Sequence, residues 1–297
     1  MKILNLAGNG NKAYFKGWYF KLQTKEGRAL ALIPAFNVDE NGYEAASVQI
    51  IFENKSRNIS LSPKEFYASR EKLFIWAGYS IFKEDGIWLN ILSHDFNLKG
   101  KIKFGDFHRP KGSFMGPFSY IPHMECAHEL ISMCHSLRGS LKLNGEKLDF
   151  DGGTAYIEAD RGKSFPEKYL WTQCCWKDTC QNSIMLAAGK VPLSFISFPG
   201  FACILLLGGR SYRFASYKGG KIIEWGRNKI IIEQGPYRLS AELLEDNPGL
   251  LKAPIGGNMK RQVEENVETR VRYKLYYRER LIFEHGDMHG SFEYSCL

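Results

Sequence analysis

The segments LFIWAGYSIF (73–82) and IWLNIL (87–92) flank the dipeptide Asp85-Gly86. Both are rich in β-branched and aromatic residues, which favour strands, and Asp-Gly suits the positive-φ positions of a two-residue hairpin turn. The same arrangement surrounds Asn144-Gly145, between residues 131–143 and 147–150. Similar short runs, each closed by a turn signal, recur about every 10–15 residues along the chain, as in β-sandwiches and barrels. We therefore predict an all-β protein of antiparallel barrels or sandwiches.

The composition indicates a globular chain with a large apolar core. Of its 297 residues, 44% are hydrophobic and 14% aromatic, more than a disordered chain contains. The net charge is +8, but the basic residues are scattered, so we expect no nucleic-acid partner. The uncharged segment Val191–Gly209 is broken by proline and glycine, which favours two buried strands over a membrane span. We expect a cytoplasmic protein with reduced cysteines, no integral membrane span and, at most, peripheral membrane contact.

A repeated aromatic segment suggests how the chain divides into domains. The aromatic group around Trp18 resembles the group around Trp171, about half a chain later, and each would form an aromatic-rich first strand. We therefore expect two tandem β domains, covering residues 1–155 and 156–297, joined through Gly152-Gly153. Helix is scarce, and the best short candidates are residues 65–70 and 258–266.

Several motifs that indicate a particular chemistry are absent from the sequence. The sequence contains no GxxxxGK[ST], no strand-to-helix GxGxxG and no GxSxG, so we predict no nucleotide cofactor and no α/β-hydrolase. A metal site deserves consideration at residues 122–135, where histidine, cysteine and carboxylate groups concentrate. On a strand, however, His123 and Glu125 would share one face. Cys126 and His128 would share the other, which splits the ligand set, and we predict no metal.

The segment that follows the expected domain boundary contains the clearest candidates for catalytic residues. Tyr156, Glu158 and Asp160 alternate, so on a strand they would share one face, with the two carboxyl groups about 7 Å apart. Burial beside aromatic rings would favour the neutral form of at least one, giving an acid that can protonate a substrate. The alternative is that Asp160 pairs with Arg161 or Lys163 and has a structural role.

Four parts of the sequence together resemble the tocopherol cyclase family. They are FKGWYFK (15–21), the run from Pro122 to His135, the block Gly153–Gln173 with its YIEADRGKSFP core, and Ala253-Pro254 with Gly257 and Met259. The resemblance covers nearly the whole chain, and it implies a pair of lipocalin-like (calycin-type) β-barrels. It also implies a cofactor-independent enzyme that adds a phenol oxygen across a prenyl double bond and closes a chromanol-type ring.

On this resemblance, Asp160 is the first candidate for the general acid, with Glu158 as its partner. His123 or His128 would accept the phenol proton. Aromatic rings could stabilise the carbocation, each contributing about 0.5–2 kcal/mol where it is desolvated. The candidates are Trp18, Tyr19, Tyr156 and Trp171. We expect the substrate-binding residues to be Trp18, Tyr19, Tyr156, Trp171, Gln173 and Glu125.

Two other functions remain open from the sequence. One is a non-catalytic, lipocalin-like binder of a lipophilic small molecule, for which a barrel mouth or the cleft between the barrels would serve as the pocket. The other is a hydratase or isomerase of a terpenoid alkene, which would use the same acid but capture the cation differently. All three imply a lipophilic ligand, such as a prenylated quinol or a terpenoid.

Overall fold

The computed structural model describes residues 13–121, 124–178, 180–193 and 196–296, and most of these lie in antiparallel strands. This confirms the predicted all-β class. The described residues contain three short 3-10 helices: η2 (Pro63–Glu65), η3 (Gly116–Tyr120) and η4 (Ser216–Lys218). Among the described residues, no helix is long and apolar enough to cross a bilayer.

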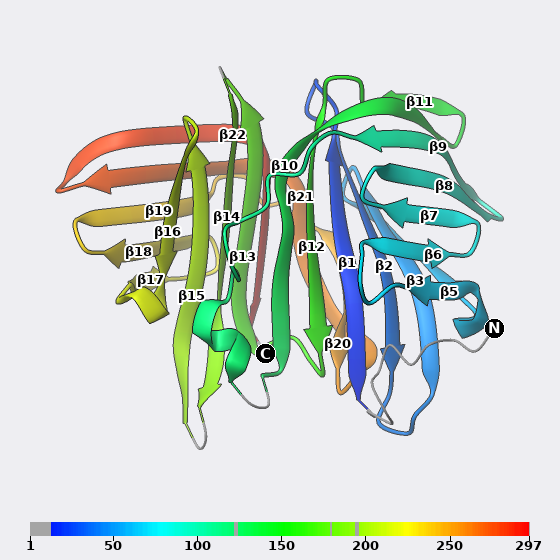
Figure 1. Ribbon diagram of the computed structural model, residues 1–297, viewed down its shortest axis with the longest axis horizontal. Helices are drawn as coiled ribbons and strands as arrows, with labels where there is room; N and C mark the ends of the chain where they lie inside the picture. The colour runs from blue at the N-terminus through cyan, green and yellow to red at the C-terminus, as the bar shows by residue number, and fades with distance from the viewer. Residues whose placement is uncertain (1–12, 122–123, 179, 194–195, 297) are drawn as a thin grey trace.

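The first sheet contains twelve strands in the order β4-β3-β2-β1-β12-β10-β9-β8-β7-β6-β5, with β11 paired to β10. Figure 1 shows β1–β3 running across β6–β9 rather than along them, so that the sheet curls over on itself. Its strands are β1 (Tyr14–Gln23), β2 (Ala29–Val38), β3 (Glu44–Phe52), β4 (Lys55–Leu61), β5 (Phe66–Ala68), β6 (Phe74–Ala77), β7 (Ser80–Lys83), β8 (Gly86–Ser93), β9 (Phe96–Phe104), β10 (Cys126–Leu143), β11 (Glu146–Asp149) and β12 (Thr154–Gly162).

The second sheet contains ten strands in the order β16-β15-β14-β13-β22-β21-β19-β18-β17, with β20 paired to β21. It forms the other half of the molecule in Figure 1. Its strands are β13 (Lys168–Lys177), β14 (Gln181–Leu193), β15 (Ile196–Leu207), β16 (Arg210–Ala215), β17 (Lys221–Trp225), β18 (Lys229–Gln234), β19 (Tyr237–Leu243), β20 (Gly249–Ile255), β21 (Asn258–Tyr277) and β22 (Arg280–Cys296).

The centres of the two sheets have the same topology. In each sheet the first strand pairs with the last: β1 with β12, and β13 with β22. The last strand pairs in turn with a long strand, β10 in the first sheet and β21 in the second. The aromatic segments around Trp18 and Trp171 therefore occupy equivalent first strands, as their similarity in sequence suggested.

Three sequence expectations need correction or adjustment. Residues 258–266 are not helical, because they begin the long strand β21, and residues 65–70 contain only the end of η2 and the strand β5. The segment 73–82 forms two strands, since Gly78, with φ +59°, turns the chain between β6 and β7. The expected boundary between residues 155 and 156 falls inside β12, whose partners β1 and β10 both belong to the first sheet, so sheet membership changes only after Gly162.

Alternation along the central strands separates three apolar cores. On β1, Trp18, Phe20 and Leu22 point into the interior of the first unit, and each such buried side chain contributes about 1.5–3 kcal/mol. The interior of the second unit is a separate cluster around residues such as Leu170 and Phe292. A third cluster lies between the units and includes Tyr19 and Trp171.

Buried polar bonds also connect the two units. Lys21 on β1 is 2% exposed, and its ammonium group donates to the His289 carbonyl at 2.8 Å and to Ser291 Oγ at 2.7 Å, both on β22. The side-chain amide of Asn37 on β2 donates to the Gly257 carbonyl at 2.7 Å. Gly257 has no room for a side chain, because a Cβ there would lie 2.0 Å from the Val38 carbonyl. The two units therefore meet through a specific interface.

Candidate active site between the two sheets

A cavity lies where the two sheets face each other. It encloses about 1360 Å³ between the atoms, including its open mouth. The first unit contributes residues of β1, β2, β3, β10, β12 and the segment around η3, and the second contributes residues of β13, β14, β15 and β20–β22. Neither unit alone would form it.

Most of the cavity wall is apolar. Aromatic rings from both units line it, and neighbouring rings meet edge to face, with centroids 5.5 Å apart for Phe15 and Phe165 and 5.6 Å apart for Phe165 and Tyr169. The remaining apolar lining includes Ile33, Phe114, Phe118, Phe201, Leu251 and Val263. A wall of this kind suits a lipophilic ligand, which is oriented by the few polar groups present.

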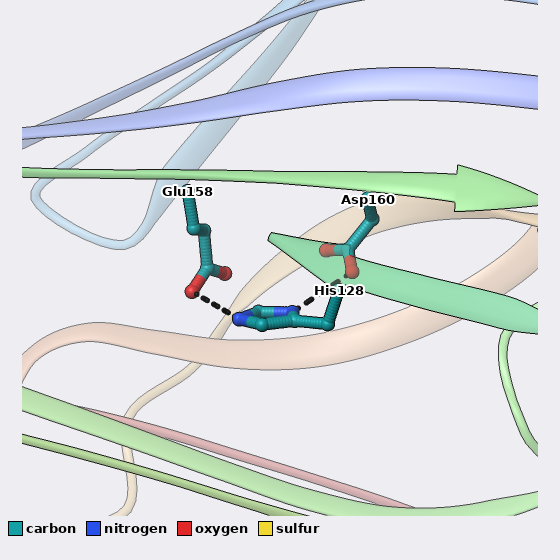
Figure 2. A group of neighbouring side chains, drawn as sticks. All are labelled: His128, Glu158 and Asp160. Atoms are coloured by element: carbon teal, nitrogen blue, oxygen red, sulfur yellow. Dashed lines mark hydrogen bonds and ion pairs between the residues drawn. The ribbon is translucent and has the colours of Figure 1, made fainter. Parts of the chain in front are cut away.

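The polar wall of the first unit centres on the His128 cluster, formed by His128, Glu158 and Asp160. Figure 2 shows the imidazole of His128 lying between the two carboxyl groups. Its Nδ1 lies 2.9 Å from Asp160 Oδ1, and its Nε2 lies 3.1 Å from Glu158 Oε2, close enough for an ion pair. All three residues line the cavity.

Strand geometry explains how the cluster forms. Alternation along β12 places Tyr156, Glu158 and Asp160 on the face that points toward the second unit, as expected from the sequence. His128 on β10 is the cross-strand partner of Asp160. The imidazole therefore meets both carboxyl groups across adjacent strands, without a long loop.

Further hydrogen bonds hold the two carboxyl groups. The Tyr156 hydroxyl donates to Glu158 Oε2, and the Trp171 indole N–H donates to the same oxygen at 3.1 Å. The Cys126 thiol donates to Asp160 Oδ1 at 3.4 Å. Because Trp171 belongs to β13, Glu158 is held by both units.

The His128 cluster favours an imidazolium. Burial opposes the charged form, but the negative charges of Glu158 and Asp160 outweigh it and raise the pKa of His128 well above its usual value. Burial, together with Asp160, also raises the pKa of the Cys126 thiol, which therefore stays protonated. The cluster is thus suited to hold a protonated imidazole between the two carboxyl groups.

Metal binding must also be considered for this cluster. One ligand atom of each member lies within 4.8 Å of the others, a spacing at which a cation could be held. Protonated His128 already pairs with both carboxyl groups, and a metal would have to displace the proton from the imidazole. The expectation of no metal stays a prediction, which elemental analysis of the purified protein would test.

The structure brings together some of the residues that the sequence singled out and not others. His128, Glu158, Asp160, Tyr19 and Trp171 all line the cavity. Tyr156 lies behind Glu158, fully buried, and acts on it through its hydroxyl. His123 lies outside the described residues.

Besides Tyr156, three other expected substrate-binding residues do not belong to the described lining. Trp18 points into the core of the first unit, because alternation along β1 places it on the opposite face from Tyr19. Gln173 is fully buried and donates to Cys175 Sγ at 3.0 Å. Glu125 is exposed and lies just before β10, where its carbonyl, rather than its side chain, accepts bonds from Lys163 and Ser164.

Two acidic residues of the cavity were missed from the sequence. Glu265 on β21 and Glu293 on β22 are cross-strand partners and line the wall of the second unit; we call them the Glu pair. They are 1% and 8% exposed. Tyr19 donates to Glu265 Oε1 at 2.5 Å, and Tyr169 donates to Glu293 Oε1. Only the pairing register of β21 and β22 brings them together.

Burial changes the ionisation of the Glu pair. It raises the pKa of Glu265 to about 7, with a further rise from Glu158 and opposing effects from the Tyr19 hydrogen bond and from Lys21. Burial and the negative charge of Glu265 raise the pKa of Glu293 well above its usual value, against the effect of the Tyr169 hydrogen bond. Burial in the second unit therefore favours the protonated form of both carboxyl groups.

Comparison with known families supports the resemblance noted in the sequence. The model of the family described as "Tocopherol cyclase-like" matches residues 73–294, three quarters of the chain. This chain belongs to that family. The matched residues include all three members of the His128 cluster and both members of the Glu pair.

A curated relative is the protein named "Probable tocopherol cyclase, chloroplastic" from Oryza sativa subsp. japonica. It is 26% identical over 169 residues, which are 54% of this chain and 36% of that protein. The chain thus matches only about a third of the length of this member of the family.

Three solved structures share the fold at low identity. Kievitone hydratase from Nectria haematococca has a TM-score of 0.55 and 10% identity, covering 95% of this chain and 89% of its own. A putative AttH from Nitrosomonas europaea has a TM-score of 0.53 and 13% identity, covering 99% and 97%. CghA has a TM-score of 0.57 and 8% identity, covering 96% and 88%. These likenesses confirm the expected lipocalin-like fold.

Proposed function

We propose that this protein catalyses an acid-initiated addition of a phenolic hydroxyl to a prenyl double bond, closing a chromanol-type ring. The observation that carries the proposal is a single apolar cavity with a charged His128 cluster on one wall. A prenylated hydroquinone has matching parts, namely an apolar tail and a ring with ionisable hydroxyl groups. Membership of the tocopherol cyclase-like family supports the same reaction class.

The reaction is an isomerisation without redox change. A proton adds to the less substituted carbon of the double bond, and a tertiary carbocation develops. The phenol oxygen then forms the new C–O bond, and its proton passes to a base. Because no electrons leave or enter the molecule, the chemistry requires no redox cofactor.

The geometry suits the His128 cluster to the phenol rather than to the double bond. Glu158 and Asp160 hold an imidazolium between them, and this arrangement requires ionised carboxylates. The role expected for Asp160, a neutral acid, does not fit that charge state. We assign Asp160, which lines the cavity and is the more exposed of the two carboxylates, as the acceptor of the phenol proton. Glu158 fixes His128 and is itself positioned by Tyr156 and Trp171.

Aromatic rings near the cluster can stabilise the cation. The rings of Tyr19 and Trp171 lie 5.4 Å apart in an edge-to-face arrangement, and both line the cavity. A ring face presented to a desolvated cation contributes about 2 kcal/mol or more. The same apolar wall excludes the water that would otherwise capture the cation.

Two other functions fit the same cavity. If water were admitted beside the cation, the protein would be a hydratase, which is the activity named for its structural neighbour from Nectria haematococca. A protein that holds a lipophilic ligand without turning it over would need the apolar wall but not the charged cluster. The charged cluster is therefore what favours catalysis.

The test compares wild-type protein with Asp160→Asn on a prenylated hydroquinone. Asp106→Asn, which removes a carboxylate from an exposed loop, is the matched control. Native mass spectrometry measures ligand retention, and chromatography measures the chromanol and any hydrated product.

We expect wild type and Asp106→Asn to form chromanol, and Asp160→Asn to be slower by about 100-fold or more, the usual contribution of general base catalysis. A hydrated product from the wild type would favour the hydratase. Equal ligand retention by all three proteins without any product would favour the binder and contradict the proposal.

A further inference from the structure

The wall of the cavity opposite the His128 cluster carries the Glu pair, for which the reaction described so far has no role. Glu265 and Glu293 come from adjacent strands of the second unit and point into the same cavity as Asp160. Carboxyl groups in an apolar wall are costly to bury unless they are paired or neutral. Their protonation state therefore decides what they can do.

The charges around the cavity distinguish the two members of the pair. Glu158 and Asp160 share one cation, His128, so their charges are only partly balanced within their own cluster. Lys21 is the cation that acts on Glu265 and lowers its pKa. The charges that act on Glu293 are those of Glu265, Glu158 and Asp160, all of which disfavour its ionised form.

The hydrogen bond from Tyr169 favours the ionised form of Glu293, but burial and the neighbouring negative charges outweigh it. The Tyr169 hydroxyl donates to Glu293 Oε1. A neutral carboxyl accepts such a bond through its carbonyl oxygen and keeps its own O–H on the other oxygen. Glu293 is also the more exposed member of the pair, at 8% against 1% for Glu265, so a ligand in the cavity reaches it more readily.

We infer that Glu293 is the catalytic residue that protonates the double bond, from the wall opposite Asp160. This inference rests on the proposed function and names the acid that it lacks. The substrate would lie between the two walls, with its phenol toward the His128 cluster and its double bond toward β22.

The proton count balances. The Glu293 O–H bond breaks as a C–H bond forms with the π electrons of the double bond, and a tertiary cation results. The phenol oxygen donates a lone pair to form the C–O bond, and its proton passes to Asp160. Transfer of that proton back to Glu293, through water that enters when the product leaves, restores the enzyme.

The imidazolium of His128 is a poorer candidate for this step. Nδ1 of His128 already bonds Asp160 Oδ1 at 2.9 Å, and Nε2 lies 3.1 Å from Glu158 Oε2, so the two carboxyl groups hold the proton on the imidazolium. Glu293 instead lies beside the ring of Tyr169, which with Phe165 forms part of the apolar lining. The cation would thus develop against aromatic rings rather than against a second positive charge.

The test uses Glu293→Gln, Glu293→Asp and the matched control Glu284→Gln, which changes an exposed carboxylate on the same strand. We expect Glu293→Gln to retain the prenylated hydroquinone in native mass spectrometry but to form chromanol about 100-fold or more slowly. Glu293→Asp should recover part of the rate, because it restores an acid at a greater distance. Glu284→Gln should match the wild type.

Infrared spectroscopy supplies a readout that does not depend on turnover. At pH 7 the wild type and Glu284→Gln should show the carbonyl band of protonated buried carboxyl groups, and in Glu293→Gln this band should weaken to the part that comes from Glu265, whose pKa is about 7. A wild type without that band, or a band unchanged in Glu293→Gln, would overturn the inference. So would chromanol formation by Glu293→Gln at the wild-type rate, which would leave the proposed function intact. A wild type that forms no chromanol would overturn both.

Discussion

The two walls of the cavity use equivalent strands to hold carboxyl groups in opposite states. In the first sheet, Glu158 and Asp160 stand on β12 beside His128 on β10. In the second, Glu293 stands on β22 beside Glu265 on β21. The strand β10 brings a cation to its carboxyl groups, whereas β21 brings another carboxyl group. Burial raises the pKa of both members of the Glu pair, whereas the buried carboxyl groups of the first wall have a cation beside them, so the neighbouring strand matters as well as burial.

The largest effect should come from removing a charge on the wall of the first unit. Glu158→Gln leaves the His128 imidazolium with one carboxylate and places an amide against two hydrogen-bond donors, Tyr156 and Trp171. We expect a loss of about 3 kcal/mol in the free energy of unfolding, the usual cost of breaking a buried ion pair. Denaturant unfolding measures this, with Glu129→Gln, an exposed carboxylate on β10, as the control. A loss no larger than the control's would mean that the cluster is not charged.

The Glu pair should make stability depend on pH. Since the pKa of Glu265 is raised to about 7 in the folded protein, its contribution is fully present below about pH 4.5 and is lost as the pH rises through 7. The shift corresponds to a fall of about 3 kcal/mol in the free energy of unfolding. Glu265→Gln should flatten the curve between these values, whereas Glu264→Gln, its exposed neighbour, should not. Parallel curves for wild type and Glu265→Gln would show that Glu265 is ionised throughout.

The smallest expected effect is the difference in unfolding free energy between two tyrosine variants. Tyr156→Phe removes a bond to a carboxylate that pairs with His128, and such charged bonds contribute about 1.5–3 kcal/mol. Tyr19→Phe removes a bond to Glu265, which is largely neutral at pH 6, and should cost about 1 kcal/mol. Unfolding of both variants at pH 6 measures the difference. Equal costs would contradict the assigned charge states.

The sequence predicted the first wall better than the second for a physical reason. Tyr156, Glu158 and Asp160 are two residues apart, so strand alternation alone places them together. Glu265 and Glu293 are 28 positions apart, and only the register of β21 with β22 makes them neighbours. The start of β21 was also expected to be helical, which concealed the direction of the Glu265 side chain.

Alternation has a limit that Trp18 illustrates. It separates Trp18 from Tyr19 on β1, but it does not say which face meets the second unit. In the structure Tyr19 faces the cavity and Trp18 the interior of its own unit. The all-β class and the equivalent first strands, by contrast, depended on local turn and strand signals, and the sequence contained enough of these.

The separation of the three apolar clusters has a consequence for how this protein can change over evolution. Each unit keeps an interior of its own, and the cavity is lined by the third cluster, between them. Substitutions that reshape the lining therefore leave both interiors packed. A lineage could acquire a new ligand by altering residues such as Ile33 or Leu251 while the scaffold stays intact. Members of such a family would be expected to diverge in specificity sooner than in fold.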